Sequence, residues 1–253
     1  MDCNDKTCIV TGAASGLGKG IAKRLINNGA NVILLDIDKI RLNEFIREIG
    51  QSKSRVEARE IDVTKYDDVQ QCISEIKNQY GHIDYLFNNA GIGGTLPFKS
   101  ATIEQWNKIV NLNLFGVING ITAVYPIMVE QKSGYIVNTS SIAGIMPFPG
   151  QVLYNTTKYG ITGLSLSLLK EAKQNNIDIS IICPGMVKTR IFYKPIIGNE
   201  ASENDVKIPK EAISIDEAID DIFDGLGKKR TVIITPKYLA KYYMIYRLFN
   251  RLP

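Results

Sequence analysis

The chain has few of the residues that build metal sites and disulfide frameworks. Its 253 residues include four cysteines, Cys3, Cys8, Cys72 and Cys183, which form no CxxC pair, and one histidine, His82. Zinc sites and disulfide scaffolds need such residues in larger numbers or at short, regular spacings. We therefore expect no metal site, and we expect a protein of the reducing cytoplasm.

Long apolar runs and an excess of one charge are also missing. No stretch approaches the roughly 18 uninterrupted apolar residues that a membrane span needs, so no transmembrane segment is expected. The N-terminal run MDCNDKTCIVTG has charge directly before a short apolar stretch, which predicts a first strand and not a signal peptide. The net charge is only +4, and basic residues alternate with acidic ones. Nucleic acid is therefore not an expected partner.

The apolar residues that are present, 45% of the chain, follow an alternating α/β pattern. Short β-branched runs alternate with stretches of helical period, as in a parallel sheet with helices on both faces. The predicted strands are Thr7–Thr11, Asn31–Asp36, Arg55–Asp62, Asp84–Asn88, Gly134–Thr139, Asp178–Cys183 and Thr231–Ile234. The predicted crossover helices are Gly18–Asn28, Tyr66–Gln79, Ile103–Glu130 and Tyr154–Gln174. This length suits one domain with one core, which we assign to residues 1–235.

Residues 188–212 interrupt this pattern with Pro195, Gly198, Pro209 and several charges. Long connections without regular structure are typical of functional loops. We expect this segment to be a mobile substrate loop that covers a site.

A glycine-rich turn follows the first predicted strand. In TGAASGLG, the residues Gly12, Gly16 and Gly18 stand where the strand turns into a helix, with Ser15 and Leu17 between them. Glycines let backbone approach a pyrophosphate closely, and a helix N-terminus offers unpaired N–H groups and a favourable dipole. The spacing GxxxGxG differs from the GxGxxG fingerprint, so a tight turn without a ligand is the alternative.

Asp36 ends the second predicted strand, roughly 20 residues beyond the turn, where an acidic side chain accepts hydrogen bonds from the adenosine ribose. A carboxylate repels a 2′-phosphate, and the next residue, Ile37, cannot neutralise it. This pattern favours NAD. The alternative is that Asp36 caps the following helix, although Asp38 can serve as the cap and leave Asp36 for the ribose.

Tyr154 and Lys158 are four residues apart and share a face if their stretch is helical. A nearby positive charge lowers a tyrosine pKa of about 10 by roughly 1 to 3, towards the range useful for acid–base catalysis. The pair alone also fits ordinary surface residues. Upstream, a predicted strand ends in Ser140 and Ser141. Open α/β sheets bind ligands at such strand ends, so a hydroxyl there can hold a substrate oxygen; simple turn chemistry is the alternative.

These motifs together resemble the short-chain dehydrogenase/reductase family over essentially the whole chain. The features that agree in order and spacing are Thr11–Gly18, Asp62-Val63, the run NNAG at 88–91, Asn113 in NLNLFG, Ser141 with Tyr154 and Lys158, and Pro184-Gly185. The resemblance implies a Rossmann fold, with a doubly wound seven-stranded parallel sheet in the order 3-2-1-4-5-6-7. It also implies an NAD-preferring enzyme that forms a homodimer or homotetramer.

By this resemblance, Tyr154 donates a proton to a carbonyl during reduction and removes one from an alcohol during oxidation. Lys158 would hold the nicotinamide ribose and lower the tyrosine pKa, and Ser141 would bind the substrate oxygen. Asn113, which the N-x-x-G spacing to Gly116 selects over Asn111, would position the lysine through a water. The implied cofactor contacts are Gly12, Ser15, Gly16, Leu17, Gly18, Asp36, Asp62, Val63, Asn89, Ala90, Gly91, Tyr154, Lys158, Pro184, Gly185, Val187 and Thr189.

Two conspicuous residues are interpreted as structural. In this family the position of His82, ahead of a strand, carries varied polar residues, so we expect it at the surface. A Ser-His-Asp hydrolase is accordingly disfavoured. Trp106 falls within a helical pattern and is expected to pack in the core.

The run TVIIT is followed by 236–253, which many short relatives lack. Thr235 is a candidate N-cap and Pro236 a candidate first helical residue of a C-terminal basic amphipathic helix. The basic residues Lys237, Lys241, Arg247 and Arg251 share one face, the apolar residues Tyr238, Tyr242, Ile245, Phe249 and Leu252 share another, and there is no acid. We expect the helix to pack on its own or a partner subunit. Peripheral contact with an anionic membrane is the alternative.

The loop after Thr189 and the stretch after Ser141 both contribute apolar residues, which suggest an apolar pocket wall. The loop contains Ile191, Phe192, Tyr193, Pro195, Ile196 and Ile197, and the stretch after Ser141 contains Met146 and Phe148. They predict a hydrophobic small-molecule substrate, namely a lipophilic secondary alcohol or its ketone of steroid, prostaglandin-like, retinoid or fatty-acyl type. The alternatives are an NADPH-dependent 3-oxoacyl or carbonyl reductase, and a non-catalytic dinucleotide-binding sensor or scaffold.

Overall fold

The computed structural model describes residues 1–249 apart from 2, 51–54, 190, 192–196 and 199–208. Its centre is a seven-stranded sheet in the order β3-β2-β1-β4-β6-β7-β9, in which every neighbouring pair is parallel. The strands are β1 (Thr7–Thr11), β2 (Asn31–Asp36), β3 (Val56–Glu60), β4 (Tyr85–Asn88), β6 (Gly134–Thr139), β7 (Ile177–Pro184) and β9 (Val232–Thr235). Counted within this sheet, the order is the predicted 3-2-1-4-5-6-7, and all seven predicted strands are confirmed.

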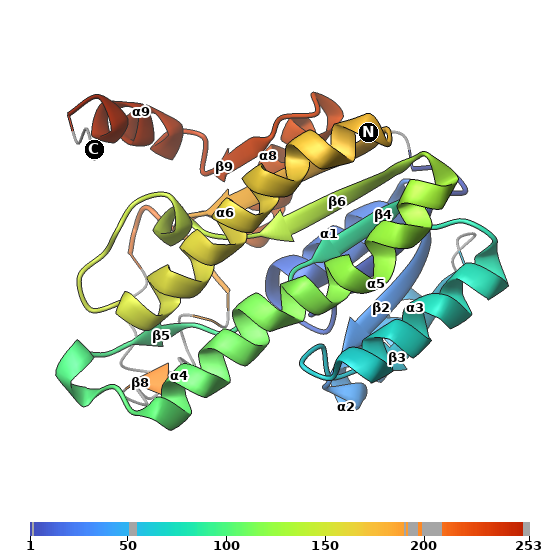
Figure 1. Ribbon diagram of the computed structural model, residues 1–253, viewed down its shortest axis with the longest axis horizontal. Coiled ribbons are helices and arrows are strands. Elements are labelled where there is room, and N and C mark those ends of the chain that lie inside the picture. The colour runs from blue at the N-terminus through green and yellow to red at the C-terminus, as the bar shows by residue number, and fades with distance from the viewer. Residues whose placement is uncertain (2, 51–54, 190, 192–196, 199–208, 250–253) are drawn as a thin grey trace.

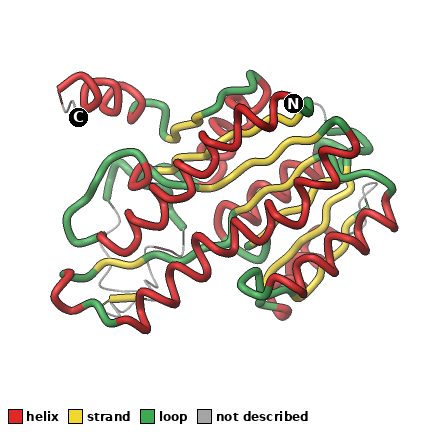
Figure 2. Tube along the Cα trace, in the orientation of Figure 1, coloured by secondary structure: helices red, strands yellow, loops and turns green. Residues whose placement is uncertain are grey.

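Helices cover both faces of the sheet (Figure 1, Figure 2). They are α1 (Gly16–Asn27), α2 (Lys39–Ile49), α3 (Tyr66–Tyr80), α4 (Ile103–Val110), α5 (Gly116–Gln131), α6 (Val152–Gln174), α8 (Ile215–Gly227) and α9 (Leu239–Phe249). The core around α1, α2 and α8 lies on one face, and the core around α3, α5 and α6 lies on the other. Because both faces are covered, β1 is buried throughout, which explains why the three residues between its terminal threonines are all apolar.

The predicted helix Ile103–Glu130 is divided by a π-helical segment, Asn111–Phe115, between α4 and α5. Among the described residues, this stretch is long and apolar enough to cross a membrane, by length and composition alone. In the structure Val117, Val124 and Met128 are buried against the sheet. Core packing therefore accounts for its apolar character.

A second, two-stranded sheet lies beyond the main one and is not among the predicted strands. It pairs β5 (Gly94–Thr95) with β8 (Ile197–Gly198) in parallel. Half of it comes from the predicted substrate loop, whose Ile197 is buried. Most of the loop, including Phe192, Tyr193, Pro195 and Ile196, lies outside the described residues. The predicted mobility of the loop therefore stays a prediction.

The tail helix is present, but its predicted start is wrong. Thr235 is the last residue of β9, and its hydroxyl donates to Asp221 Oδ2 at 3.0 Å, so it caps no helix. Pro236 is buried in the turn that follows, and α9 begins only at Leu239. Thr235 is paired with Pro184 in the sheet and its hydroxyl is bound by Asp221 on α8, so neither its backbone nor its side chain is available to begin a helix. α9 then projects from the body of the protein (Figure 1).

Candidate active site

The glycine-rich turn joins the end of β1 to the start of α1. Gly12 and Gly16 have φ values of +65° and +55°, which favour glycine. A side chain on Gly12 would place its Cβ 2.8 Å from Ala90 Cα, so the turn requires glycine there. Ser15 is the N-cap residue but makes no capping hydrogen bond through its side chain. The first turn of α1 also has no acidic residue, so it can receive an anion.

Thr11 binds the glycine turn to the NNAG segment. Its Oγ1 accepts hydrogen bonds from the backbone N–H groups of Asn89 and Ala90, at 2.9 and 3.1 Å. Asn89 Nδ2 in turn donates to Gly12 O at 3.5 Å. Two predicted cofactor segments, 77 residues apart in the chain, are thus in contact. Thr11 was not among the predicted site residues, and its position at a strand end beside the first glycine is the signal that marks it.

Asp36 lies at the end of β2, beside the glycine turn. Its Oδ2 accepts from Ala14 N and its Oδ1 from Asp38 N, both at 3.0 Å. Asp38 is the N-cap of α2, and its Oδ1 accepts from Arg41 N at 3.1 Å. The prediction that Asp38 is the cap is therefore confirmed. Each Asp36 oxygen retains capacity for a further hydrogen bond, which a ribose hydroxyl can supply.

Asp62 and Val63 follow β3, next to the end of β2. Asp62 Oδ1 accepts from the backbone N and the hydroxyl of Thr64, at 2.9 and 2.7 Å. Val63 is buried, and its carbonyl accepts from Asn119 Nδ2 on α5 at 2.9 Å. Asn119 was not predicted to support the site. Its place in an otherwise apolar stretch of helix is the sequence signal that it has a buried partner.

Tyr154 and Lys158 lie on α6 and face the end of β6. Lys158 is buried, and its Nζ donates to Thr139 O at 2.9 Å and lies 5.6 Å from the centre of the Tyr154 ring. Ser141, two residues past Thr139, accepts from Ala143 N and donates to Pro184 O, at 3.1 and 3.3 Å. The structure therefore brings the tyrosine, the lysine and the serine together at the carboxyl end of the sheet.

The two neighbouring serines have different surroundings. Ser140 Oγ donates to Lys158 O at 2.8 Å and lies 2.9 Å from Thr162 Oγ1, so its hydroxyl is already hydrogen-bonded to α6. Ser141 instead hydrogen-bonds Tyr154, which is one of the causes that act on the tyrosine pKa. Of the two hydroxyls, only that of Ser141 is placed to act with the phenol.

Burial controls the ionisation of Tyr154 and Lys158. It raises the pKa of Tyr154 to about 12, and the hydrogen bond with Ser141 offsets this only in part. It also lowers the pKa of Lys158 to about 8. The expectation that the ammonium makes the phenol more acidic is thus wrong for the protein alone. Burial disfavours the charged forms of both groups, and it is the largest cause of both shifts.

Asn113 is fully buried in the π-helical segment between α4 and α5. Its Oδ1 accepts from Ile92 N at 2.8 Å, while its Nδ2 donates to Ile92 O at 2.9 Å and to Thr157 Oγ1 at 3.3 Å. It therefore ties the segment after NNAG to α6, one residue before Lys158. These direct contacts position both segments at the site.

Replacing Asn113→Ala should lower the free energy of unfolding by about 2 to 4 kcal/mol, because it leaves the buried N–H and C=O of Ile92 without partners. Urea unfolding followed by circular dichroism measures this loss. Asn111→Ala, an exposed position in the same π-helical segment, is the control and should change stability by less than about 0.5 kcal/mol. Equal effects of the two substitutions would contradict the anchoring role of Asn113.

The chain after β7 crosses the site. Gly185 N donates to Thr235 O at 2.7 Å, and Val187 forms a parallel bridge with Ile213. The Thr189 side chain lies against the glycine turn, 3.7 Å from where a Cβ on Gly16 would be. The structure thus brings the predicted nicotinamide segment, 184–189, over the predicted phosphate-binding turn.

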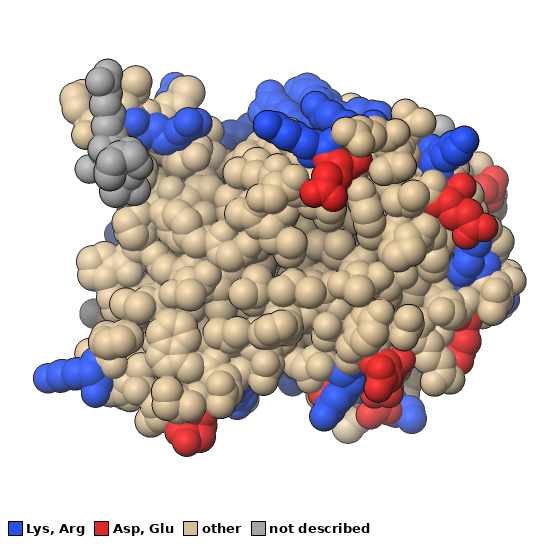
Figure 3. Space-filling view, viewed as in Figure 1, with Lys and Arg blue, Asp and Glu red and all other residues tan. Residues whose placement is uncertain are grey.

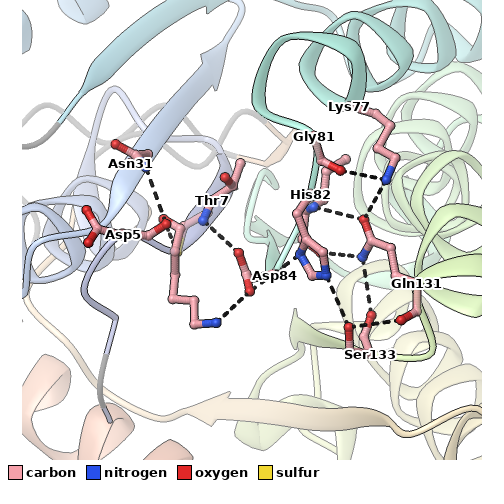
Figure 4. A network of polar contacts seen from close by, with 12 residues as sticks. Asp5, Thr7, Asn31, Lys77, Gly81, His82, Asp84, Gln131 and Ser133 are labelled. Atoms are coloured by element: carbon pink, nitrogen blue, oxygen red, sulfur yellow. Dashed lines mark hydrogen bonds and ion pairs between the residues drawn. The ribbon is translucent and has the colours of Figure 1, made fainter.

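His82 lies at the opposite ends of the strands, where β4 and β6 begin. Figure 4 shows it between Ser133 and Asp84; Nε2 is 3.2 Å from Ser133 Oγ, and Nδ1 is 3.5 Å from Asp84 Oδ1. The Asp84 carboxylate also binds Lys6 Nζ at 3.1 Å and accepts from Thr7 N at 2.9 Å. The side chain of His82 is 43% exposed, which agrees with the predicted surface position. Asp84 therefore joins the starts of strands, far from the site around Tyr154.

Trp106 is partly buried and packs against a small apolar core, as predicted. This core consists of Ile92, Leu96, Ile109, Leu153 and Ile197, and Tyr154 packs on it as well. The phenol of the site is therefore set in apolar surroundings.

A doubly wound parallel sheet with a glycine turn after β1, an acid at the end of β2 and a Ser-Tyr-Lys set at its carboxyl end defines a dinucleotide-binding oxidoreductase. A family profile described as short chain dehydrogenase matches residues 6–195. The chain belongs to the short-chain dehydrogenase/reductase family and is an oxidoreductase of that type.

Comparison with individual proteins agrees with this assignment. A 3-oxoacyl-[acyl-carrier-protein] reductase of Thermotoga maritima is 36% identical over 77% of this chain and 79% of its own. A diacetyl reductase [(S)-acetoin forming] of Staphylococcus epidermidis is 31% identical over 88% and 83%. A short-chain dehydrogenase from Sphingobium yanoikuyae in complex with NADPH has a TM-score of 0.82 and 27% identity, and covers 98% of this chain and 96% of its own. One from Burkholderia phymatum in complex with NAD shares the fold, with a TM-score of 0.88, 23% identity, and coverage of 100% and 98%.

Proposed function

We propose that the protein is an NAD(H)-dependent enzyme that interconverts a lipophilic secondary alcohol and its ketone. The observation that carries the proposal is the meeting of Ser141, Tyr154 and Lys158 at the carboxyl ends of the strands, beside a glycine turn and Asp36. A hydroxyl, a phenol and an ammonium at such a place suit proton transfer to and from a substrate oxygen.

The residues present fit a dinucleotide. Gly12 has no side chain, and one there would collide with Ala90, so the backbone of the turn stays accessible. The first turn of α1 presents N–H groups for a pyrophosphate. Asp36 would bind the adenosine ribose, and Asp62-Val63 with Asn89–Gly91 would flank the adenine end. Lys158 and Tyr154 would hold the nicotinamide ribose, while the segment 184–189, through Val187 and Thr189, would hold the carboxamide. The bound nicotinamide supplies the carbon that gives or takes the hydride.

The protein side of the reaction is a proton transfer. At neutral pH the phenol of Tyr154 is protonated, because burial raises its pKa to about 12, so it is ready to donate to a carbonyl oxygen. Ser141, which hydrogen-bonds this phenol, would share the substrate oxygen with it. For oxidation the same group must first lose its proton. Lys158 would favour that loss whenever its own charge is present.

The two directions should therefore depend differently on pH. Between about pH 6 and 8, kcat/KM for alcohol oxidation should rise by up to about tenfold per pH unit, because the phenolate fraction rises while pH is below the pKa. kcat/KM for ketone reduction should stay nearly flat over the same range, because the phenol remains protonated. Initial rates of NADH formation and consumption measure both profiles. An oxidation rate that falls as pH rises would exclude Tyr154 as the base.

Apolar surroundings support a lipophilic substrate. The ring of Tyr154 packs on an apolar core that includes Ile92 and Leu153, and Ile191 lies against Gly93. Phe148, seven residues after Ser141 in the sequence, is partly exposed. Steroid, prostaglandin-like, retinoid and fatty-acyl alcohols share the bulk and apolarity that such a site prefers.

A reductase of 3-oxoacyl or other carbonyl groups that uses NADPH is the second candidate, because a relative at 36% identity is named 3-oxoacyl-[acyl-carrier-protein] reductase. Asp36 favours the first candidate, since its carboxylate stands where a 2′-phosphate would be repelled. A panel of hydrophobic secondary alcohols with NAD⁺, set against 3-oxoacyl thioesters with NADPH, separates them by which pair shows turnover. A sensor or scaffold without catalysis would bind dinucleotide and turn over neither.

The assembly and location proposed for this enzyme rest on the resemblance to the family and on the composition of the chain. We propose a homodimer or homotetramer in the cytoplasm, and sedimentation velocity of the purified chain measures the assembly.

A further inference from the structure

The C-terminal helix α9 exposes an apolar surface. None of its residues is buried, and six large apolar side chains are each more than 40% exposed: Tyr238 just before the helix, then Tyr242, Met244, Ile245, Leu248 and Phe249. The last two are 72% and 82% exposed. At 100° per residue, Tyr238, Tyr242, Ile245 and Phe249 form one continuous stripe along the helix. Such a stripe on the surface marks an interaction site.

The opposite side of α9 holds it on the protein. Tyr243 packs against the apolar core of Ile145, Ile181 and Cys183. Leu239 lies against Gly185, where a side chain on the glycine would collide with it. Tyr238 belongs to the outer stripe and is 41% exposed, and its Oη also donates to Glu211 O at 3.3 Å. The expected packing on the same subunit thus accounts for the inner side only, and it leaves the apolar stripe facing outward.

An exposed positive charge lies beside this stripe. The segment 236–253 contains Lys237, Lys241, Arg247 and Arg251 and no acidic residue. Lys237 is paired with Asp221 and Asp224 on α8, and the Arg247 guanidinium lies 5.8 Å from the centre of the Tyr243 ring. Lys241, in contrast, is exposed beside the stripe. Figure 3 shows that Lys and Arg also gather along the same edge of the molecule, over the C-terminal end of α6. The surface therefore combines exposed apolar and aromatic side chains with positive charge.

We propose that the outer face of α9 docks on an anionic lipid surface. Tyrosines and aliphatic side chains would enter the headgroup boundary, and the lysine beside them would contact the lipid phosphates and carboxylates. A second copy of the chain fits this face less well. The chain carries a net charge of +4 and the tail has no acid, so a symmetric contact through α9 would bring like charges together.

Flotation of the full chain with lipid vesicles tests the proposal. We expect recovery with vesicles containing about one third phosphatidylserine, little recovery with phosphatidylcholine alone, and weaker recovery as salt is raised. Ile245→Ser/Phe249→Ser should abolish flotation. Lys241→Gln should lower the partition coefficient about fivefold, the effect of one basic residue near an anionic surface.

Matched controls lie elsewhere on the protein. Ile40→Ser, on α2, removes an apolar side chain that is 71% exposed, and Lys99→Gln removes an exposed charge; both should float like the wild type. Unchanged thermal melting would show that the α9 variants are folded. Equal flotation of wild type and the α9 double variant overturns the proposal, as does no flotation of the wild type. If, in addition, the double variant halves the mass seen by sedimentation velocity, a second copy covers α9 instead.

Discussion

Tyr154→Phe should reduce kcat/KM for both alcohol oxidation and ketone reduction by about 10²- to 10⁴-fold, the range attributed to general acid–base catalysis. The substitution removes one oxygen from a ring that stays packed on the apolar core beside Leu153 and Ile197. The fold should therefore persist, and so should NADH binding. Steady-state rates, with NADH affinity from fluorescence titration, measure the two effects separately.

The same helix provides a control for this substitution. Tyr159 is the next tyrosine on α6 and is 39% exposed, so Tyr159→Phe removes the same atom from a position turned away from Lys158. Its rates should match those of the wild type. Retention of wild-type turnover by Tyr154→Phe, with NADH bound normally, would assign the proton transfer to another group and remove the basis of the proposed mechanism.

The second large effect concerns the choice of dinucleotide. The wild type should favour NADH over NADPH by at least about 100-fold in kcat/KM, because Asp36 and a 2′-phosphate would place two negative charges near one another. Asp36→Asn should remove most of this discrimination, and Asp36→Asn/Ile37→Arg should reverse it by adding a cation for the phosphate. Initial rates with each reduced cofactor at subsaturating concentration measure the ratio.

Asp38→Asn is the control for Asp36→Asn, because it removes a negative charge from a neighbouring position. Asn is also a good N-cap, so this variant should keep α2 capped through Arg41 N while it removes a carboxylate two residues from Asp36. Its preference for NADH should be unchanged. A wild type that prefers NADPH would show that Asp36 serves only the backbone of Ala14 and Asp38, and would favour the carbonyl-reductase alternative.

These predictions use residues whose types and spacing could be found in the sequence. Buried parallel strands have nearly uninterrupted apolar runs, which is why β1 and β2 were predicted with the bounds the structure has. Tyr154 and Lys158 could be paired because four residues make about one helical turn. Asp36 and Asp38 could be told apart because capping is a local rule. The sheet order and the roles of the site residues depended on resemblance to a family, and the structure confirms the order.

Contacts between distant segments could not be predicted from residue types and spacing. Nothing local indicates that Thr11 holds Asn89, that Asn113 binds the backbone of Ile92, or that Asp221 holds Thr235 in β9. The pKa of Tyr154 was expected in the wrong direction for the same reason. Spacing shows that a lysine is near, but only the packed structure shows how far water is excluded from both groups.

The sequence by itself therefore determined the seven strands of the main sheet, the class of fold and the chemical groups of the site. It did not predict the small β5–β8 sheet, the π-helical segment Asn111–Phe115 or the start of α9 at Leu239. The tertiary structure alone decided how those groups are held, how readily they ionise, and that the apolar stripe of α9 faces outward. Local patterns follow from the geometry of one helix or strand, whereas burial and long-range hydrogen bonds exist only once all the elements have packed.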